Sequence, residues 1–160
     1  MTLELRRAFG HFATGVTVVT TMTAGGTRAG ITVNSFSSLS LDPPLLLWAI
    51  ARTANTFDAF RAGRGFAVHI LHSGQAPLAV RFASTLPDRF ADVVTETGTS
   101  GAPLLPDFLA RFDCAAHAVL EGGDHLILVG RVLDHVTRDG DPLVFYRGRF
   151  HEALGGAHGA

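Results

Sequence analysis

The spacing of apolar residues near the start of this chain predicts an amphipathic helix. Four of them recur at i, i+3, i+4 and i+7, namely Leu5, Ala8, Phe9 and Phe12. Residues at this spacing lie on one face of a helix. Thr2 is suited to cap its start, and Thr14-Gly15 is expected to end it. Shorter patterns of the same kind predict two further helices, over residues 57–60 and 75–83.

Strands are predicted where β-branched residues cluster or where apolar and polar residues alternate. These segments are residues 16–22, 28–34, 45–50, 65–71, 112–120, 125–133 and 142–146. Turn sequences such as Ala24-Gly25-Gly26 and Asp139-Gly140 separate neighbouring segments, as in antiparallel hairpins. We therefore expect a mainly β fold, an antiparallel split β-barrel with peripheral helices. No G-x-G-x-x-G sequence follows a strand, so a nicotinamide cofactor would not be bound in the Rossmann manner.

A run of small polar residues overlaps the end of the second predicted strand. Residues 32–44 contain Thr32, Asn34 and four serines and end in Asp42-Pro43-Pro44, which predicts a loop. Hydroxyl and backbone N–H groups on such a loop can hydrogen-bond a phosphate or the polar edge of a flat ligand. A serine-rich turn closed by prolines explains the same residues without a ligand.

A second polar run, from Arg52 to Thr56, directly precedes the predicted helix at residues 57–60. The first N–H groups of a helix are unpaired and its dipole is positive there, so Arg52 beside Asn55 and Thr56 predicts an anion site. Ordinary capping of the helix by Asn55 or Thr56 is the other interpretation, and the two are compatible.

Composition narrows the class of protein. The 160 residues suit one domain, which we place at residues 1–154, followed by a flexible tail at 155–160. The formal net charge is −1 and all 13 basic residues are arginine, which disfavours general binding to nucleic acid or to anionic membranes. One cysteine, Cys114, excludes an intrachain disulfide, and no long apolar run occurs, so we expect a cytoplasmic protein. The 47% hydrophobic content leaves room for an apolar interface with a second subunit.

Few side chains are candidates for acid–base or nucleophilic chemistry. His125 is the most interesting, because it follows Gly-Gly-Asp at the start of a predicted strand and histidine can donate a hydrogen bond to a ligand; a structural role is the alternative. His69 and His72 would point to opposite faces of a strand end, so no metal site is expected. The serines lack a G-x-S-x-G turn, which disfavours serine hydrolysis. This shortage of reactive groups favours a protein that binds a cofactor with its own reactivity.

Six segments together resemble the short-chain flavin reductase family, the reductase components of two-component flavin-dependent monooxygenases. They are F-A-T-G-V-T-V-V-T (12–20), T-V-N-S-F-S-S-L-S-L-D-P-P-L (32–45), F-A-V-H-I-L (66–71), L-A-V-R-F-A (78–83), G-D-H-L-I-L-V-G-R-V (123–132) and P-L-V-F-Y-R-G-R-F (142–150). The resemblance covers about residues 4 to 152. It implies an FMN-binding split barrel that forms a homodimer, with flavin near the subunit interface.

The resemblance also implies a reaction and roles for individual residues. NAD(P)H would reduce FMN or FAD, and the reduced flavin would leave for a separate monooxygenase. The residues that would contact flavin are Thr32, Asn34, Ser35, Ser37, Ser38, Arg52, Asn55, Thr56, Phe82 and Ala83. Of these, Arg52, Asn55 and Thr56 would hold the phosphate end. His125, the catalytic candidate, and Tyr146 would lie on the nicotinamide side, while His69 stands where the family commonly has Asn.

Two other functions fit parts of the same pattern. A flavin-binding electron-transfer protein would use the same polar runs, but it would retain its cofactor and would not turn over NAD(P)H. A split-barrel oxidase of a phosphorylated pyridoxine-like substrate, or a haem-binding relative, would need a second basic cluster for its ligand, and the sequence shows none. The sequence does not decide whether the flavin is FMN or FAD, or whether the donor is NADH or NADPH. It also does not identify the partner monooxygenase.

Overall fold

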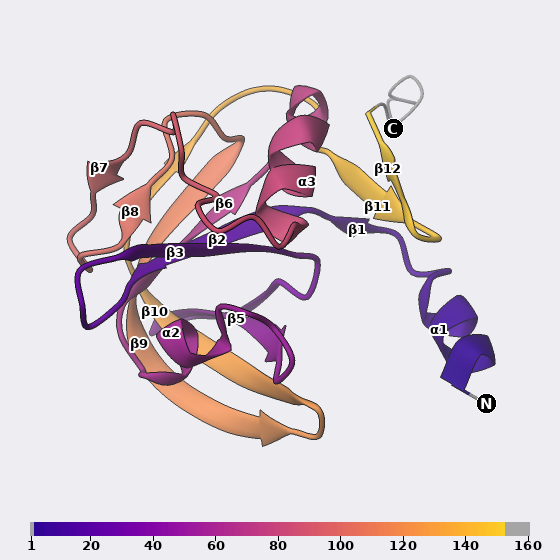
Figure 1. Cartoon of the computed structure of the whole chain (residues 1–160), viewed down its shortest axis with the longest axis horizontal. Coiled ribbons are helices and arrows are strands. Elements are labelled where there is room, and N and C mark those ends of the chain that lie inside the picture. Colours follow the sequence, from indigo (N-terminus) through magenta and orange to yellow (C-terminus); the bar gives the residue numbers. More distant parts are fainter. Residues whose placement is uncertain (1, 153–160) are drawn as a thin grey trace.

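An antiparallel sheet of seven strands frames the molecule, of which the computed structural model describes residues 2–152 (Figure 1). The strands lie in the order β3-β2-β6-β9-β10-β5-β4. Their bounds are β2 Thr17–Met22, β3 Arg28–Val33, β4 Ser37–Leu41, β5 Pro44–Ala51, β6 Phe66–Ile70, β9 Ala110–Gly122 and β10 His125–Thr137. The prediction of a mainly β, antiparallel fold is confirmed. Within residues 2–152 no ladder joins the end strands β3 and β4, so hydrogen bonds do not close the sheet into a complete barrel.

Smaller elements flank this sheet. A three-stranded sheet has the order β1-β11-β12, and β7 pairs with β8. The bounds are β1 Thr14–Gly15, β7 Glu96–Thr97, β8 Pro103–Leu104, β11 Val144–Tyr146, β12 Arg149–His151, α1 Thr2–Phe9, α2 Phe57–Arg61, η1 Ser73–Gln75 and α3 Ala76–Ala83. The three predicted helices are thus confirmed. Figure 1 shows α1 and the β11–β12 hairpin projecting on the same side of the main sheet.

Trp48 of β5 lies in the first of two large hydrophobic clusters. Its side chain is fully buried and meets Phe60 of α2 and Phe66 of β6 edge-on, with ring centroids 4.8 and 5.8 Å away. Contacts of this geometry add about 0.5–1.5 kcal/mol each beyond the burial of apolar area. Phe60 therefore anchors α2 in this cluster and fixes the polar run that precedes it.

The second cluster holds α3 against β3. Gly30 of β3 faces Phe82 of α3, and a Cβ atom at position 30 would lie 2.6 Å from the Phe82 ring. Only glycine lets the helix approach this closely. Phe82 is itself fully buried and meets Phe90 edge-on, with 4.9 Å between ring centroids. This packing brings the end of α3 next to the end of β3.

The serine-rich run is the main correction to the predicted elements. A loop was expected over residues 32–44, but Ser37–Leu41 form β4, which pairs antiparallel with β5. β4 lies at the edge of the sheet and its side chains are mostly exposed. An edge strand needs backbone groups for its ladder but no run of apolar side chains, and serine supplies those groups as well as valine does.

Three further expectations need comment. Thr14-Gly15, expected to end the first helix, forms β1 against β11 instead, and α1 ends at Phe9. The short strand β8 lies between residues 83 and 112, where no strand was expected. The predicted tail at 155–160 lies outside the described residues.

Candidate functional site

Two adjoining hollows lie on either side of Asn34, directly after β3. The first, of about 170 Å³, is lined by Thr32, Ala83 at the end of α3, and the two phenylalanines of the β11–β12 hairpin, Phe145 and Phe150, among others. The second, of about 250 Å³, lies between Asn34 and residues around β1. Asn34 is exposed and lines both hollows. Mostly apolar walls with a few polar groups are typical of small-molecule sites.

The hydroxyl groups of the first polar run are largely used within the protein. Thr32 Oγ1 donates to the carbonyl of Ala79 at 2.6 Å and so ties β3 to α3. Ser35 Oγ both donates to the carbonyl of Ala49 at 2.8 Å and accepts from its N–H at 2.9 Å, in place of a backbone ladder. Ser37 donates to the carbonyl of Ser38 at 3.0 Å, and both serines are exposed on β4. Of these residues, Asn34 and Thr32 line the hollows.

The second polar run lies at the start of α2, next to the turn between β9 and β10. Arg52 makes an ion pair with Glu121, and its Nε donates to the carbonyl of Gly123 at 3.2 Å. Asn55 is exposed, and Thr56 is the N-cap residue of α2. The capping interpretation is wrong for Thr56, because its side chain makes no capping hydrogen bond.

His125 lies on that same turn, so the structure brings it close to Arg52. The backbone N–H of Arg52 donates to the carbonyl of Asp124 at 2.9 Å, and His125 pairs with Ala51 across the ladder. His125 Nδ1 lies 2.7 Å from Asp124 Oδ1, and the His125 side chain is 43% exposed. The hydrogen bond to His125 and the charge of that ring lower the pKa of the Asp124 carboxyl. The carboxylate therefore orients an exposed imidazole.

Tyr146 and Phe82 are placed differently from the other predicted site residues. Tyr146 is on β11, and its ring neighbours are His11 at 6.4 Å and His151 at 6.3 Å, not His125. The Phe82 side chain belongs to the core, whereas Ala83 lines the hollow beside Thr32. Of the predicted pair, Ala83 is the one with a side chain at the site.

Sequence reasoning missed Thr14 and the phenylalanines at positions 36, 145 and 150. The hydroxyl groups of Thr14 and Thr56 are buried and have no hydrogen-bond partner within residues 2–152. A buried polar atom without a partner commonly indicates a ligand or an ordered water. Thr14 and Phe36 line the second hollow. The apolar cleft has the Asn34 amide between its two halves and the Thr14 hydroxyl, unpaired within residues 2–152, in its lining. Such a cleft fits a flat ring with polar edges, as in a flavin.

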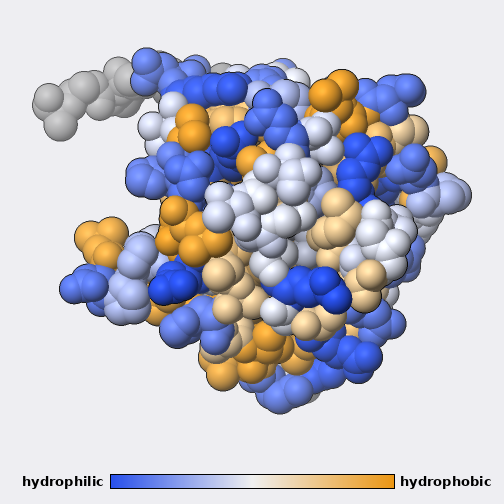
Figure 2. Space-filling view, turned by 90° about the vertical axis from the view of Figure 1, so that its left-hand side faces the viewer, coloured by the Kyte–Doolittle hydropathy of each residue, from blue (hydrophilic) through white to orange (hydrophobic). Residues whose placement is uncertain are grey.

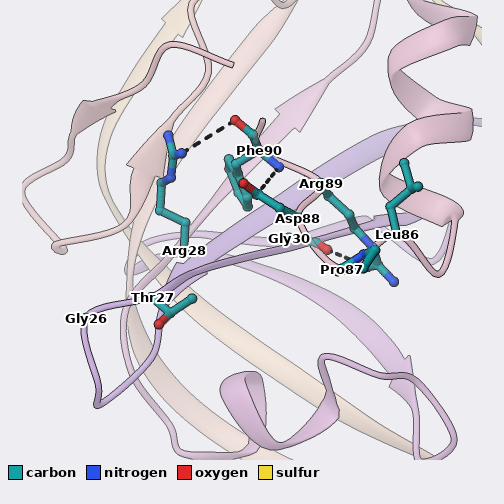
Figure 3. A pocket seen from close by; sticks show the side chains of 9 residues that line it. All are labelled: Gly26, Thr27, Arg28, Gly30, Leu86, Pro87, Asp88, Arg89 and Phe90. Carbon is teal, nitrogen blue, oxygen red and sulfur yellow. Dashed lines mark hydrogen bonds between the residues drawn. The ribbon is translucent and has the colours of Figure 1, made fainter. Parts of the chain in front are cut away.

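Another hollow, of about 440 Å³, lies between the β2–β3 turn and residues 86–90 (Figure 3). Its two arginines are engaged by the protein itself. Arg28 donates to the carbonyls of Phe90 and Val93 at 3.4 and 3.1 Å, and Arg89 donates to the carbonyl of Gly30 at 2.7 Å. Figure 3 shows the Arg28 and Arg89 side chains extending to opposite sides of Phe90. These arginines hold the segment after α3 in place, so we assign this hollow no part in the site.

The histidines considered for metal binding have other partners. His69 is fully buried, with Nδ1 3.0 Å from the carbonyl oxygen of Val18 and Nε2 accepting from the N–H of Leu105 at 3.0 Å. His72 Nε2 lies 2.7 Å from Asp107 Oδ2. Within residues 2–152 no group of three or more His, Cys, Asp or Glu side chains is arranged to hold a metal ion.

None of the helices in the described part of the chain is long and apolar enough to cross a membrane.

Several known flavin reductases are similar to this chain in sequence. The chain is 47% identical to the FMN reductase (NADH) SmoA of Agrobacterium fabrum over 147 aligned residues. The alignment covers 92% of this chain and 83% of that protein. The chain is 44% identical to the reductase component of the flavin-dependent trigonelline monooxygenase of Acinetobacter baylyi, over 92% of this chain and 47% of that protein. The chain spans less than two thirds of several such curated relatives.

A solved structure matches over nearly the whole chain. The Streptomyces globisporus NADH:FAD oxidoreductase SgcE6, in complex with NAD and FAD fragments, has a TM-score of 0.89 and 39% identity, covering 98% of this chain and 94% of that one. The family described as flavin reductase like domain matches residues 9–154. This chain therefore belongs to the flavin reductase family.

Proposed function

We propose that this protein is an NAD(P)H:flavin oxidoreductase, which reduces FMN or FAD and supplies the reduced flavin to a separate monooxygenase. The single observation that carries the proposal is the divided hollow around Asn34, with the buried and unpaired hydroxyl of Thr14 beside it, in a chain of this family. Residues 1–154 would act as one flavin reductase domain. A cytoplasmic location suits a protein that depends on reduced nicotinamide cofactors.

Asn34 and its neighbours would hold the flavin ring. The Asn34 amide can both donate and accept hydrogen bonds, as the edge of the ring requires. Thr32, Ser35, Ser37 and Ser38 would contribute mainly through the backbone they shape, because the Thr32, Ser35 and Ser37 hydroxyls already have protein acceptors. Ala83 would border the ring, with Phe82 supporting it from the core.

Arg52, Asn55 and Thr56 would hold the phosphate of the flavin. The Thr56 hydroxyl has no hydrogen-bond partner in the described part of the chain and lies at the N-terminus of α2. Arg52 is already paired with Glu121, so its guanidinium would be shared between that carboxylate and a phosphate. The exposed Asn55 amide can turn toward the same phosphate.

A bound flavin supplies the hydride acceptor, so the chain has to place the donor rather than provide a nucleophile. His125 would do so: Asp124 holds its Nδ1, which leaves Nε2 on the opposite side of the ring for a nicotinamide donor. Tyr146 would contact that donor from the β11–β12 hairpin. Positioning of this kind lowers the barrier by fixing donor and acceptor in contact.

We infer that the protein forms a homodimer through the apolar face of α1, which carries Leu5 and Phe9 and continues to Phe12. No residue of α1 is buried, and Phe9 and Phe12 are 70% and 78% exposed. Large aromatic side chains at this exposure indicate an interaction surface. Figure 2 shows the opposite side, with the β2–β3 turn of Figure 1, where apolar residues form separate patches among polar ones. Sedimentation equilibrium tests the proposal; a monomer at micromolar concentration would contradict it.

Steady-state oxidation of NADH or NADPH with excess FMN or FAD tests the proposed reaction. We expect turnover with at least one pair of donor and flavin. Flavin that stays bound through gel filtration, without any NAD(P)H oxidation, would instead favour an electron-transfer protein. Product transfer is tested by adding a flavin-dependent monooxygenase from the same genome and measuring oxygenated product.

A further inference from the structure

Three arginines from distant parts of the sequence surround a hollow that the proposed flavin site does not use. Arg6 and Arg7 come from the last turn of α1, and Arg147 comes from the turn between β11 and β12. With Gly10 and Gly148 they line about 380 Å³. The backbone N–H of Arg147 donates to the carbonyl of Gly10 at 3.1 Å, which fixes the hairpin against the end of the helix region. The sequence alone showed no such basic cluster.

In the described part of the chain, these three arginines have no direct partner for their guanidinium groups, although the charge of Arg6 also acts on Asp124. Within residues 2–152 the guanidinium groups of Arg6, Arg7 and Arg147 make no hydrogen bond or ion pair, and no acidic residue lines the hollow. Other arginines of this chain behave differently: Arg81 and Arg89 donate to backbone carbonyls. Three like charges at a hollow with no acidic side chain in its lining repel each other, so this arrangement favours an anionic ligand.

The backbone at Arg147 also points to a role for its side chain. Arg147 has φ 49° and Gly148 has φ 80°, so both central residues of this two-residue hairpin turn are left-handed. Such turns favour Asn-Gly, because residues with a larger side chain rarely adopt a positive φ. An arginine here is unfavourable for the turn itself, which suggests that its guanidinium is needed at this place.

The hollow adjoins Tyr146, one of the two residues proposed for the nicotinamide side. Tyr146 directly precedes Arg147, and its ring neighbour His11 follows Gly10. The charge of Arg6 also contributes to lowering the pKa of Asp124, the carboxylate that holds His125. A donor whose nicotinamide lies at these residues would carry its phosphates toward the arginines.

We propose that this hollow binds the phosphate groups of the NAD(P)H donor, through the guanidinium groups of Arg6, Arg7 and Arg147. The proposal rests on the proposed reductase function. Arginine suits this task because its fork of N–H groups matches phosphate oxygens and stays charged at all working pH values. The flavin phosphate has separate candidate ligands at residues 52–56.

The test compares donors with and without phosphate. The variants are Arg147→Asn, which removes the charge but suits the left-handed turn, and the double variant Arg6→Gln with Arg7→Gln. The control is Arg64→Gln, an exposed arginine outside the hollow. The donors are NADH, NADPH and reduced N-benzylnicotinamide, which has no phosphate. We expect KM for the dinucleotides to rise about tenfold or more, corresponding to a lost charge-assisted hydrogen bond.

With reduced N-benzylnicotinamide, and for the KM of FMN, each variant should match the wild-type protein. An unchanged KM for NADH and NADPH in both variants would overturn the proposal, as would equal losses with the phosphate-free donor. A higher KM for FMN but not for riboflavin would overturn it too, and would assign the hollow to the flavin phosphate.

Direct binding separates this proposal from the reductase function. ADP-ribose carries the diphosphate but no nicotinamide, and calorimetry measures its affinity without any turnover. We expect Arg147→Asn to weaken its binding by about tenfold, with Arg64→Gln unchanged. Equal affinity in all proteins, or no binding by any, would refute the phosphate site even if the enzyme reduces flavin. A wild-type protein that binds ADP-ribose but turns over no donor would refute only the reductase function.

Discussion

Two regions of this molecule each contain a histidine with hydrogen-bonding partners. They differ in whether a ring nitrogen of that histidine stays available for a ligand. On β6, both ring nitrogens of His69 are engaged by backbone groups and the side chain is fully buried. At the start of β10, only Nδ1 of His125 has a partner within residues 2–152, and the ring is partly exposed. A histidine with every nitrogen paired stabilises the fold, whereas one with a free nitrogen at the surface can serve a ligand.

Replacing His69 with Ala should have the largest effect on stability. It leaves the Val18 carbonyl and the Leu105 N–H unpaired in the core and opens a cavity. The free energy of unfolding should fall by about 4 kcal/mol, measured by urea denaturation. Activity per folded molecule at low temperature should change little. A loss below about 1 kcal/mol would contradict the structural role.

The pH dependence of stability should reveal the same histidine. Burial lowers the pKa of His69 from 6.5 to about 4, with the hydrogen bond to Val18 opposing this and the charge of Arg111 adding to it. In the unfolded chain the imidazole takes up a proton near its ordinary pKa, so its contribution is fully present above pH 6.5 and is lost as the pH falls toward 4. The loss should reach about 3 kcal/mol.

His69→Gln provides the control for that titration. Glutamine can donate to one backbone group and accept from the other, but it does not titrate in this range. The variant should lose stability less steeply between pH 6.5 and 4 than the wild-type protein does. Identical pH profiles would show that other groups cause the acid sensitivity.

His125→Ala should leave stability intact and lower kcat/KM for NADH by about 100-fold, while the affinity for flavin changes little. Flavin affinity is read from fluorescence quenching, and turnover from NADH absorbance. The exposed His117→Ala on β9 is the matched control and should behave as wild type. Equal losses in turnover and flavin binding would mean that His125 holds the flavin or the fold instead.

The smallest expected effects concern the two unpaired hydroxyls. Thr14→Val and Thr56→Val each remove a buried polar atom that has no partner within residues 2–152, so stability should stay equal or rise slightly. If these hydroxyls bind flavin, its dissociation constant should rise about fivefold in each variant. Unchanged affinity in both variants would remove them from the site.

Much of the frame could be predicted from the sequence because the local signals agreed with the packing. The β-branched segment at residues 17–22 produced the buried strand β2. The spacing of Leu5, Ala8 and Phe9 also indicated α1 correctly, although no residue of that helix is buried. His125 was placed correctly at the start of a strand, because Gly-Gly-Asp marks a hairpin turn unambiguously.

Other features depend on partners distant in the sequence. β4 was missed because its serines and the following Asp42-Pro43-Pro44 indicated a loop, whereas its pairing with β5, a contact between strands, makes it a strand. Ser35 was expected to contact ligand, yet its hydroxyl pairs with both backbone groups of Ala49. Phe82 matched the site segment but turns into the core beneath Gly30. Arg147 joins Arg6 only through the docking of the hairpin, which no local pattern indicates.

Anaerobic mixing of the purified protein with FMN and NADH tests the central claim most directly. The account predicts that the visible absorbance band of the flavin bleaches while an equal amount of NADH is consumed, with repeated turnovers when FMN is in excess over protein. If neither FMN nor FAD is bleached faster than in a protein-free mixture, with NADH or with NADPH, the account is contradicted.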